Sequence, residues 1–382
     1  MTPRTATLAL VDPTGEPLGT LPLGTMPTPW WQDTTDVVEA AKAIHHVDVT
    51  VLRLLKAELP QAPGGAVTYV AELTGPPPPA TRPDTDPAWT QPHPKRMPWA
   101  NPGGPASSLH WAEQVLTGLP ITGRHQLRTW NLSSIWRLDT PQGPFWLKEV
   151  PPFMHHEAAV LTWLTRPTTP HLIAADQGRQ LLADIPGTDR YHATTNDRAE
   201  MLRDLLDIQD DATPDLLAHG VPDRRTPALV DGIRTTIDAA PLPHHHREAL
   251  HRLADELHEL DDHGIPDTLL HGDFHPGNVR THDGHHVILD WGDSAIANPA
   301  WDLIRMQDNS STLTTRWCTH WHRKAPGSSP ERAAALAAKL APLRDAATYQ
   351  AFLDNIEPTE HPYHAADVPH ALAAALPTSP HA

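Results

Sequence analysis

Three side chains with oxygen atoms that could bind a metal or a proton follow one another at fixed spacing. The segment HGDFHPGN, residues 271–278, places Asp273 two residues after His271 and Asn278 five residues after Asp273. Asp290 lies in HHVILDW, a run that predicts a short strand with Asp290 at its end. Phosphoryl transfer from ATP needs a carboxylate that orients the attacking hydroxyl and accepts its proton, and two oxygen ligands that hold Mg²⁺. Asp273, Asn278 and Asp290 supply that set.

The same residues match motifs of kinases. The spacing H-x-D-x-x-x-x-N is that of the kinase catalytic loop, and DWG at residues 290–292 stands where kinases have D-F-G. Kinases also need an upstream lysine on a strand and a glutamate on the next helix, because this pair holds the nucleotide phosphates. Lys148 ends the predicted strand FWLK, and Glu157 lies nine residues later at the start of a predicted helix. For His271 we expect a structural role, in which hydrogen bonds hold the loop.

Three short motifs carry a resemblance to one enzyme family. HGDFHPGN, ILDWGDS and NPAWDL together resemble the signature of the aminoglycoside phosphotransferase and choline kinase family, small-molecule kinases with a protein-kinase-like fold, over about residues 120–382. The resemblance implies a β-rich N-lobe that holds ATP and a helical C-lobe that carries the catalytic and metal-binding loops. Residue by residue, it implies a catalytic base, Asp273; two magnesium ligands, Asn278 and Asp290; an ion pair, Lys148 and Glu157; a hinge that meets adenine within LLADIPG, Asp184 and Ile185; and a carboxylate that stabilises the catalytic loop, Asp302.

The chain departs from protein kinases at two places. RTWNLSSIWRL stands where a phosphate-covering glycine-rich loop belongs, yet it contains no glycine. We expect Ser133 and Ser134 to contact the phosphates there, through hydroxyl and backbone N–H groups. Only a few residues separate Asp290 from NPAWDL, which leaves no room for the long activation segment that docks a peptide. The acceptor is therefore expected to be a small molecule.

The flanking elements predict an α+β chain in which a small additional domain precedes a bilobal kinase-like part. Residues 1–75 alternate β-rich runs with one helix, DVVEAAKAI, in which Asp36 and Glu39 stand at capping-box spacing. Their strand-helix-strand order is similar to that of Nudix domains, but the glutamate-rich Nudix box is absent, so hydrolysis is not expected. If the likeness holds, this part is a binding or docking module, and otherwise it is an accessory α+β domain. Eleven prolines between residues 76 and 105 predict a linker. The predicted boundaries are 1–75 for this degenerate Nudix-like accessory domain, 76–119 for the linker and a short helix, 120–187 for the N-lobe and hinge, and 188–382 for the C-lobe.

Composition indicates which classes of partner and which cell compartment to expect. The chain carries 29 Lys and Arg against 46 Asp and Glu, a formal net charge of −17. This charge opposes sequence-independent binding to nucleic acid and to anionic membranes, whereas a cationic acceptor fits it. Cys318 is the only cysteine, so we expect no intrachain disulfide. No apolar run approaches the roughly 20 residues of a membrane span, and we expect a cytoplasmic protein whose oligomeric state is open.

These observations predict an enzyme. The expected activity is that of an ATP- and Mg²⁺-dependent phosphotransferase that phosphorylates a hydroxyl of a small molecule, such as an aminoglycoside-like antibiotic, an amino alcohol or a sugar. The alternative is a pseudokinase-like binding protein with weak activity, whose N-terminal domain docks a partner. The glycine-free loop favours the alternative, and the complete set of charged positions favours the enzyme. The identity of the acceptor and the choice between ATP and GTP stay open.

Overall fold

The computed structural model describes residues 2–211, 214–308 and 310–376, and the chain divides into two compact units. The first unit contains the residues up to Phe153 together with Ile173–Asp184 and Ala351–Ala366. The second contains Met154–Leu172, Ile185–Gln350 and the residues from Asp367 onward. Both units mix helices and strands, which confirms the predicted α+β class. None of the described helices combines the length and the apolar character that a bilayer crossing requires.

The compact units differ from the predicted domains in two places. Residues 1–75 pack in the same unit as the strands within residues 120–149. Residues 351–366, which belong to the predicted C-lobe, also join this first unit. The first unit is therefore assembled from three separate stretches of the chain.

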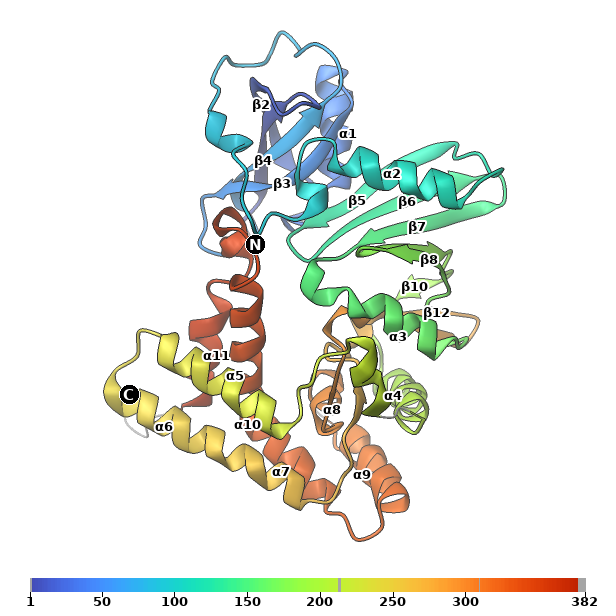
Figure 1. Ribbon diagram of the computed structural model, residues 1–382, viewed down its shortest axis with the longest axis vertical. Coiled ribbons are helices and arrows are strands. Elements are labelled where there is room, and N and C mark those ends of the chain that lie inside the picture. The colour runs from blue at the N-terminus through green and yellow to red at the C-terminus, as the bar shows by residue number, and fades with distance from the viewer. Residues whose placement is uncertain (1, 212–213, 309, 377–382) are drawn as a thin grey trace. The chain divides into compact units, whose positions relative to one another are not determined.

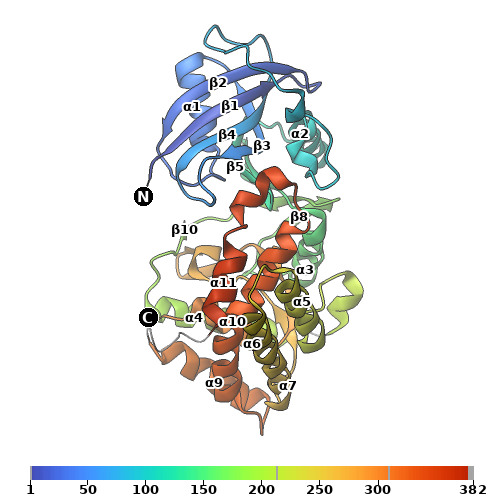
Figure 2. The ribbon, with the colours of Figure 1, turned by 90° about the vertical axis from the view of Figure 1, so that its left-hand side faces the viewer.

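The N-terminal part of the first unit is a four-stranded sheet in the order β2-β1-β4-β3. Its strands are β1 Arg4–Val11, β2 Pro17–Met26, β3 Val49–Ala57 and β4 Gly65–Leu73; β1 pairs in parallel with β4, and the other pairs are antiparallel. Helix α1, Thr35–His45, packs on one face of this sheet (Figure 2). Successive residues of a strand point to opposite faces, and both faces of this sheet carry apolar residues, which is why both faces need a cover.

Helix α1 does not use the predicted capping box. The helix begins at Thr35 with Thr34 as its N-cap, and no side chain caps it. Asp36 instead pairs with Arg4, whose Nη2 lies 2.6 Å from both carboxylate oxygens. The capping-box prediction for Asp36 and Glu39 is therefore wrong, because a fully buried arginine takes the carboxylate.

The proline-rich segment covers the second face of the N-terminal sheet. It contains two short 3₁₀ turns, η1 Pro87–Trp89 and η2 Pro98–Ala100, and leads into helix α2, Gly104–Val115. Trp89 packs against the outward residues of three strands, Ala9, Val11, Leu52 and Val70. The segment predicted as a linker is therefore a packed part of the first unit.

A second sheet follows in the order β5-β6-β7-β9-β8. Its strands are β5 Gly123–Trp130, β6 Ser133–Thr140, β7 Gly143–Glu149, β8 Leu172–Asp176 and β9 Arg179–Ala183. Helix α2 lies along one face of this sheet (Figure 1) and packs on Leu138, Leu147 and Leu181. The run QLRTWNLSSIWRLDT forms two strands, because the chain reverses between Trp130 and Ser133.

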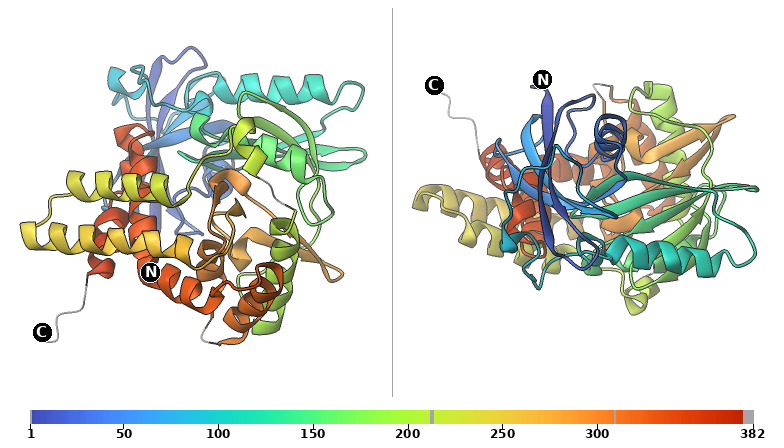
Figure 3. Two further views of the ribbon diagram at one scale, coloured as in Figure 1. Left: turned by 60° about the horizontal axis from the view of Figure 1, so that its bottom comes forward. Right: turned by 90° about the horizontal axis from the view of Figure 1, so that it is seen from above.

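The second unit is mostly helical. Its helices are α3 His156–Leu164, α4 Thr195–Gln209, α5 Thr226–Ala239, α6 His244–Asp255, α7 Glu259–Asp262, α8 Ala300–Met306, α9 Thr312–Lys324, most of α10 Pro330–Leu353, and α11 Asp367–Ala375. Helices α5 and α6 lie side by side (Figure 3). Two small antiparallel sheets carry the motif loops: β10 Thr188–Asp189, β12 Val279–His282 and β13 His285–Ile288 in one, and β11 Thr268–Leu270 and β14 Ala295–Ala297 in the other.

Candidate active site

The loop that follows β11 is held by a buried carboxylate. Asp302, in the first turn of α8, accepts hydrogen bonds from the backbone N–H groups of His271 at 2.8 Å and Gly272 at 2.9 Å. Its Oδ2 also accepts a hydrogen bond from Gln209 Nε2 at 3.1 Å. Burial raises the pKa of Asp302, while His271 and the two backbone N–H groups favour the ionised form. These contacts confirm the expected structural role of Asp302, because they fix the backbone directly before Asp273.

The ring of His271 joins the catalytic loop to the residues before Asp290. Its Nε2 lies 2.7 Å from the carbonyl oxygen of Leu289, and its Nδ1 lies 3.3 Å from the backbone nitrogen of Asp273. Because a carbonyl can only accept, Nε2 carries the proton and Nδ1 accepts from the Asp273 N–H group. The ring also packs against Trp291, with centroids 4.7 Å apart. Both ring nitrogens are engaged within the protein, which confirms the structural role expected of His271.

Asp273 lies at the centre of a set of polar contacts. Asn278 Nδ2 donates to Oδ2 of Asp273 at 3.1 Å, and Arg305 Nη1 lies 2.6 Å from Oδ1. His275 Nε2 lies 3.5 Å from Oδ2. Burial opposes ionisation of Asp273, yet the hydrogen bond from His275 and the charge of Arg305 hold the pKa of this carboxyl below its usual value. A carboxylate kept ionised in this way can accept the proton of a hydroxyl group.

Arg305 is a site residue that the sequence analysis missed. It lies in α8, and 43% of its side chain is exposed. No sequence motif predicts a site role for Arg305. The one available signal is its position three residues after Asp302, because residues at this spacing share a face of a helix. Both side chains reach the catalytic loop from that face of α8.

Asn278 and Asp290 offer oxygen ligands in the same unit as Asp273. The Nδ2 group of Asn278 donates to the carbonyl and the carboxylate of Asp273 at 3.0 and 3.1 Å, which leaves Oδ1 for a cation. Asp290 has φ 62° and ψ 67°, a left-handed conformation that non-glycine residues adopt rarely and often at functional sites. Among the described residues, no group of three or more His, Cys, Asp or Glu side chains could hold a metal ion. Mg²⁺ does not need such a group, because it binds one or two protein oxygens together with substrate phosphates, so the residues present fit it.

The catalytic loop passes close to the segment after Asp290. Gly272 has φ +87°, and a Cβ atom at this position would lie 2.1 Å from the carbonyl oxygen of Asp293, so only glycine fits. Arg344 Nη2 donates to the Gly272 carbonyl at 2.5 Å. Burial, together with the charges of Asp273 and Asp290, raises the pKa of Asp293 to about 7. The two loops that carry the predicted base and the predicted metal ligand are thus packed directly against each other.

Glu157 reaches this segment from helix α3. Its Oε1 accepts a hydrogen bond from the backbone N–H of Trp291 at 3.0 Å, and the residue is 2% exposed. Glu157 therefore fixes the backbone next to Asp290. Lys148 belongs to the first unit and Glu157 to the second, so their predicted ion pair stays a prediction.

In the first unit, Lys148 points away from helix α2. Residues directly opposite on neighbouring strands share a face of the sheet, and Lys148 lies opposite Ile135. Its neighbour Leu147 lies on the other face and packs against α2. Because side chains alternate along β6, Ser133 shares the face of Lys148, whereas Ser134 lies on the face that α2 covers and is 2% exposed. This arrangement argues against a phosphate contact by the Ser134 hydroxyl.

The other predicted nucleotide contacts already have partners within the first unit. Ser133 Oγ accepts a hydrogen bond from Trp130 Nε1 at 3.0 Å. Asp184 Oδ1 accepts one from Trp146 Nε1 at 2.9 Å. Ile185, the next hinge residue, is the first residue of its stretch in the second unit. The roles of Ser133, Asp184 and Ile185 toward a nucleotide stay predictions.

Comparison with known proteins places this chain in one family. The model of the phosphotransferase enzyme family matches residues 127–336, more than half of the chain. A comparison with curated protein sequences gives no match. One similar solved structure is the apoenzyme of the macrolide 2′-phosphotransferase MphH from Brachybacterium faecium, with 18% identity and a TM-score of 0.51 over 72% of this chain and 98% of that one. A second is the choline kinase LicA from Streptococcus pneumoniae, with 14% identity and a TM-score of 0.53 over 71% of this chain and 98% of that one. A third is a GDP complex of aminoglycoside 2′-phosphotransferase-IIIa, with 14% identity and a TM-score of 0.50 over 70% of this chain and 97% of that one. At these identities the structures show a shared fold, and they confirm the predicted kinase-like architecture. The chain therefore belongs to the phosphotransferase enzyme family.

Proposed function

We propose that the protein transfers the γ-phosphoryl group of ATP, with Mg²⁺, to a hydroxyl group of a small molecule. The observation that carries this proposal is the placement of Asp273, whose Oδ2 accepts a hydrogen bond from Asn278 Nδ2 at 3.1 Å and whose Oδ1 lies 2.6 Å from Arg305 Nη1. The loop on which it stands is fixed by Asp302 and His271. A fixed, ionised carboxylate is what the transfer requires of a residue that orients an attacking hydroxyl.

Each predicted residue has one task in this reaction. Asp273 orients the hydroxyl of the acceptor and takes its proton as the new O–P bond forms. Asn278 and Asp290 hold Mg²⁺, which when bound neutralises charge on the phosphates. Lys148 contacts the α and β phosphates.

The remaining nucleotide contacts lie at the hinge and at the β5–β6 turn. The backbone of Asp184 and Ile185 meets the adenine ring. Backbone N–H groups near Ser133 face the phosphates. Two of the three similar structures belong to antibiotic phosphotransferases and one to a choline kinase, so acceptors of these classes come first in a test. The net charge of −17 supports a cationic acceptor.

The test is ADP release by the full-length chain with ATP and Mg²⁺ against macrolides, aminoglycosides, amino alcohols, amino sugars and nucleosides. Asp273→Asn should lower turnover by about 10²–10⁴-fold, because the proton acceptor is lost. Asp283→Asn is the matched control, since its side chain is 85% exposed in the same unit. Equal turnover of the two variants would contradict the proposal. ATP binding without transfer to any acceptor would favour a pseudokinase-like binding protein instead.

A further inference from the structure

One glutamine joins the two sheets of the first unit. Strands β3 and β5 are the edge strands of their sheets. The Val51 N–H group donates to Oε1 of Gln126 at 2.9 Å, and Nε2 of Gln126 donates to the Val51 carbonyl at 2.7 Å. The side-chain amide thus satisfies the same two backbone groups that another strand would satisfy. Strand β5 is thereby fixed to the N-terminal sheet.

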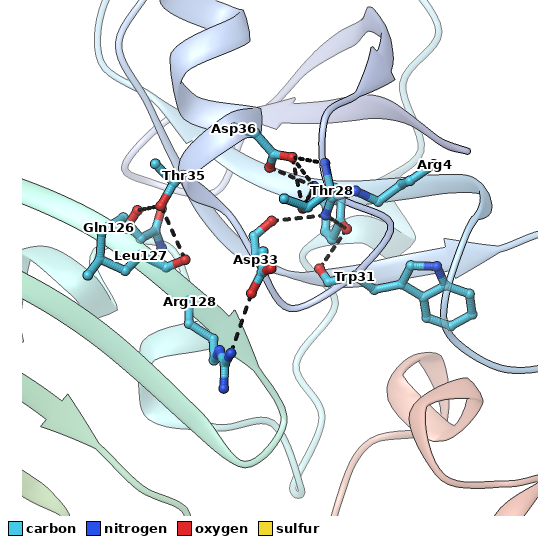
Figure 4. Close-up of polar contacts among 10 residues, drawn as sticks. Arg4, Thr28, Trp31, Asp33, Thr35, Asp36, Gln126, Leu127 and Arg128 are labelled. Atoms are coloured by element: carbon cyan, nitrogen blue, oxygen red, sulfur yellow. Dashed lines mark hydrogen bonds and ion pairs between the residues drawn. The ribbon is translucent and has the colours of Figure 1, made fainter. Parts of the chain in front are cut away.

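The loop before helix α1 gives β5 a second set of contacts (Figure 4). The Thr34 N–H group donates to the carbonyl of Leu127 at 3.1 Å. Asp33 and Arg128 form an isolated antiparallel bridge, and Arg128 Nη2 lies 3.5 Å from Asp33 Oδ1. The N-terminal domain therefore contacts β5 through its backbone as well as through side chains.

A buried arginine holds this loop in place. Arg4 is fully buried, and its Nη1 donates to the Asp33 carbonyl at 2.9 Å and to the Tyr69 hydroxyl at 3.1 Å (Figure 4). Its Nη2 pairs with Asp36 at 2.6 Å. The Tyr69 hydroxyl in turn donates to the carbonyl of Trp31 at 2.7 Å. Hydrogen bonds and an ion pair therefore hold the loop that contacts β5 to the core of the N-terminal sheet.

The contacts along β5 lead to the glycine-free turn between β5 and β6. Asn131 and Leu132 form this two-residue turn, Trp130 pairs with Ser133, and neither turn residue has a positive φ. Two-residue hairpins favour turns with positive φ, because other turn types splay the strands, so this turn needs support from outside. Asn131 is 0% exposed, and its Oδ1 lies 3.3 Å from Nε2 of His364. Burial lowers the pKa of His364 to about 4, so a neutral ring donates this hydrogen bond.

That support comes from the segment Ala351–Ala366, which we call the strap. Glu357 of the strap lies 2.7 Å from Arg53 of β3, and both side chains are nearly inaccessible to solvent. Tyr363 lies in the core of the N-terminal sheet, and its ring centroid lies 5.5 Å from that of Trp130. The strap is therefore anchored in the N-terminal domain and contacts Trp130 and Asn131, on the β5 side of the β5–β6 turn.

We propose that the N-terminal domain and the strap together fix the β5–β6 turn for nucleotide binding, with Gln126, Asn131 and His364 as positioning residues. A glycine-rich loop must be ordered when a nucleotide binds, whereas backbone N–H groups of a fixed turn already stand in place. Less conformational entropy is then lost on binding. The N-terminal domain is in this way a part of the nucleotide-binding lobe. The inference rests on the proposed function, because it takes the nucleotide phosphates to meet this turn.

The test uses the full-length chain and two measurements. Hydrogen exchange of the amides of residues 127–135 reports how firmly the turn is held, and calorimetric titration with ATP and Mg²⁺ reports nucleotide affinity. His364→Leu removes the hydrogen bond to Asn131. The buried ring of His364 is already neutral, so this change removes no charge. His364→Gln keeps an N–H donor there. His110→Leu is the matched control, because His110 is 69% exposed on α2.

For His364→Leu we expect the turn amides to exchange about tenfold faster, the effect of one lost hydrogen bond. ATP affinity should fall about fivefold, since the turn must now be ordered on binding. His364→Gln and His110→Leu should stay close to the wild-type protein in both measurements. Gln126→Leu, which frees β5 from Val51, should act in the same direction as His364→Leu.

Two outcomes overturn the inference. Faster exchange with unchanged ATP affinity would show that the turn does not position the phosphates. Unchanged exchange in both His364→Leu and Gln126→Leu would show that the strap and the N-terminal domain do not hold the turn. If the wild-type chain binds no ATP, the proposed function fails, and the exchange data alone still separate a held turn from an unsupported one.

Discussion

Replacing Asp302 by asparagine turns one carboxylate oxygen into an NH₂ group and keeps the shape of the side chain. Asp302 accepts hydrogen bonds from three donors, the backbone N–H groups of His271 and Gly272 and the side chain of Gln209. Whichever way the new amide turns, at least one of these donors faces NH₂. We therefore expect the catalytic loop to lose a hydrogen bond and to gain a contact between two donors.

The size of the effect follows from these contacts. A hydrogen bond to a charged group contributes about 1.5–3 kcal/mol, and a buried donor without a partner costs about 1–3 kcal/mol. The change also removes the cost of burying a charge, which is visible in the raised pKa of Asp302. The balance is a loss of about 2–3 kcal/mol in the free energy of unfolding of the second unit. The corresponding decrease in Tm is about 5–10 °C.

Scanning calorimetry of the wild-type chain and Asp302→Asn measures this loss. Asp207→Asn is the matched control, because Asp207 is exposed on α4 and should change stability by less than about 0.5 kcal/mol. Phosphotransfer, measured well below the Tm, should also fall in Asp302→Asn, since the loop no longer holds Asp273 in one position. If Asp302→Asn unfolds at the same temperature as Asp207→Asn, the carboxylate does not hold the loop and the reasoning is refuted.

Three further changes test other contacts. Gly272→Ala places a Cβ atom 2.1 Å from the carbonyl oxygen of Asp293 at φ +87°; urea denaturation should show a loss of about 3 kcal/mol, and an unchanged midpoint would contradict the close packing. Arg305→Gln removes a charge that lowers the pKa of Asp273, so the acid limb of the pH–rate profile should move to higher pH; an unmoved limb would exclude the ion pair. Burial raises the pKa of Glu360 to about 8, so the free energy of unfolding should fall by about 1 kcal/mol per pH unit as the pH rises toward 8 and the buried carboxyl loses its proton. Glu360→Gln should remove this dependence of Tm on pH. Parallel curves of Tm against pH for the two proteins would contradict the prediction.

The C-lobe half of the site could be predicted because its chemistry is local in sequence. HGDFHPGN keeps Asp273 and Asn278 five residues apart, so one loop conformation suffices to bring them together. Asp290 was predictable from the strand before it. Arg305 was not, because its contact with Asp273 depends on how α8 packs against the loop. The motif predicts the catalytic loop, whereas the contact of Arg305 with this loop depends on tertiary packing.

The N-terminal half could not be predicted to the same depth, because its contacts are distant in sequence. The partners Val51 and Gln126 are 75 residues apart, and Asn131 and His364 are 233 residues apart. The prolines predicted a linker, and composition does not report that Trp89 of this segment packs on the sheet. The sequence also does not reveal the β5–β6 turn, because no glycine marks it and apolar and β-branched residues stand on both sides.

The missing glycine now has a physical explanation that does not involve loss of activity. Glycine is needed in a turn that has positive φ or that must move, and the Asn131-Leu132 turn has no positive φ. It does not need to move if Gln126 and His364 hold it, and a side chain at Asn131 then serves as the point of attachment. On this reasoning, the N-terminal domain and the glycine-free turn are two parts of one arrangement. Replacing Asn131 and Leu132 by glycine should therefore loosen the turn and weaken ATP binding.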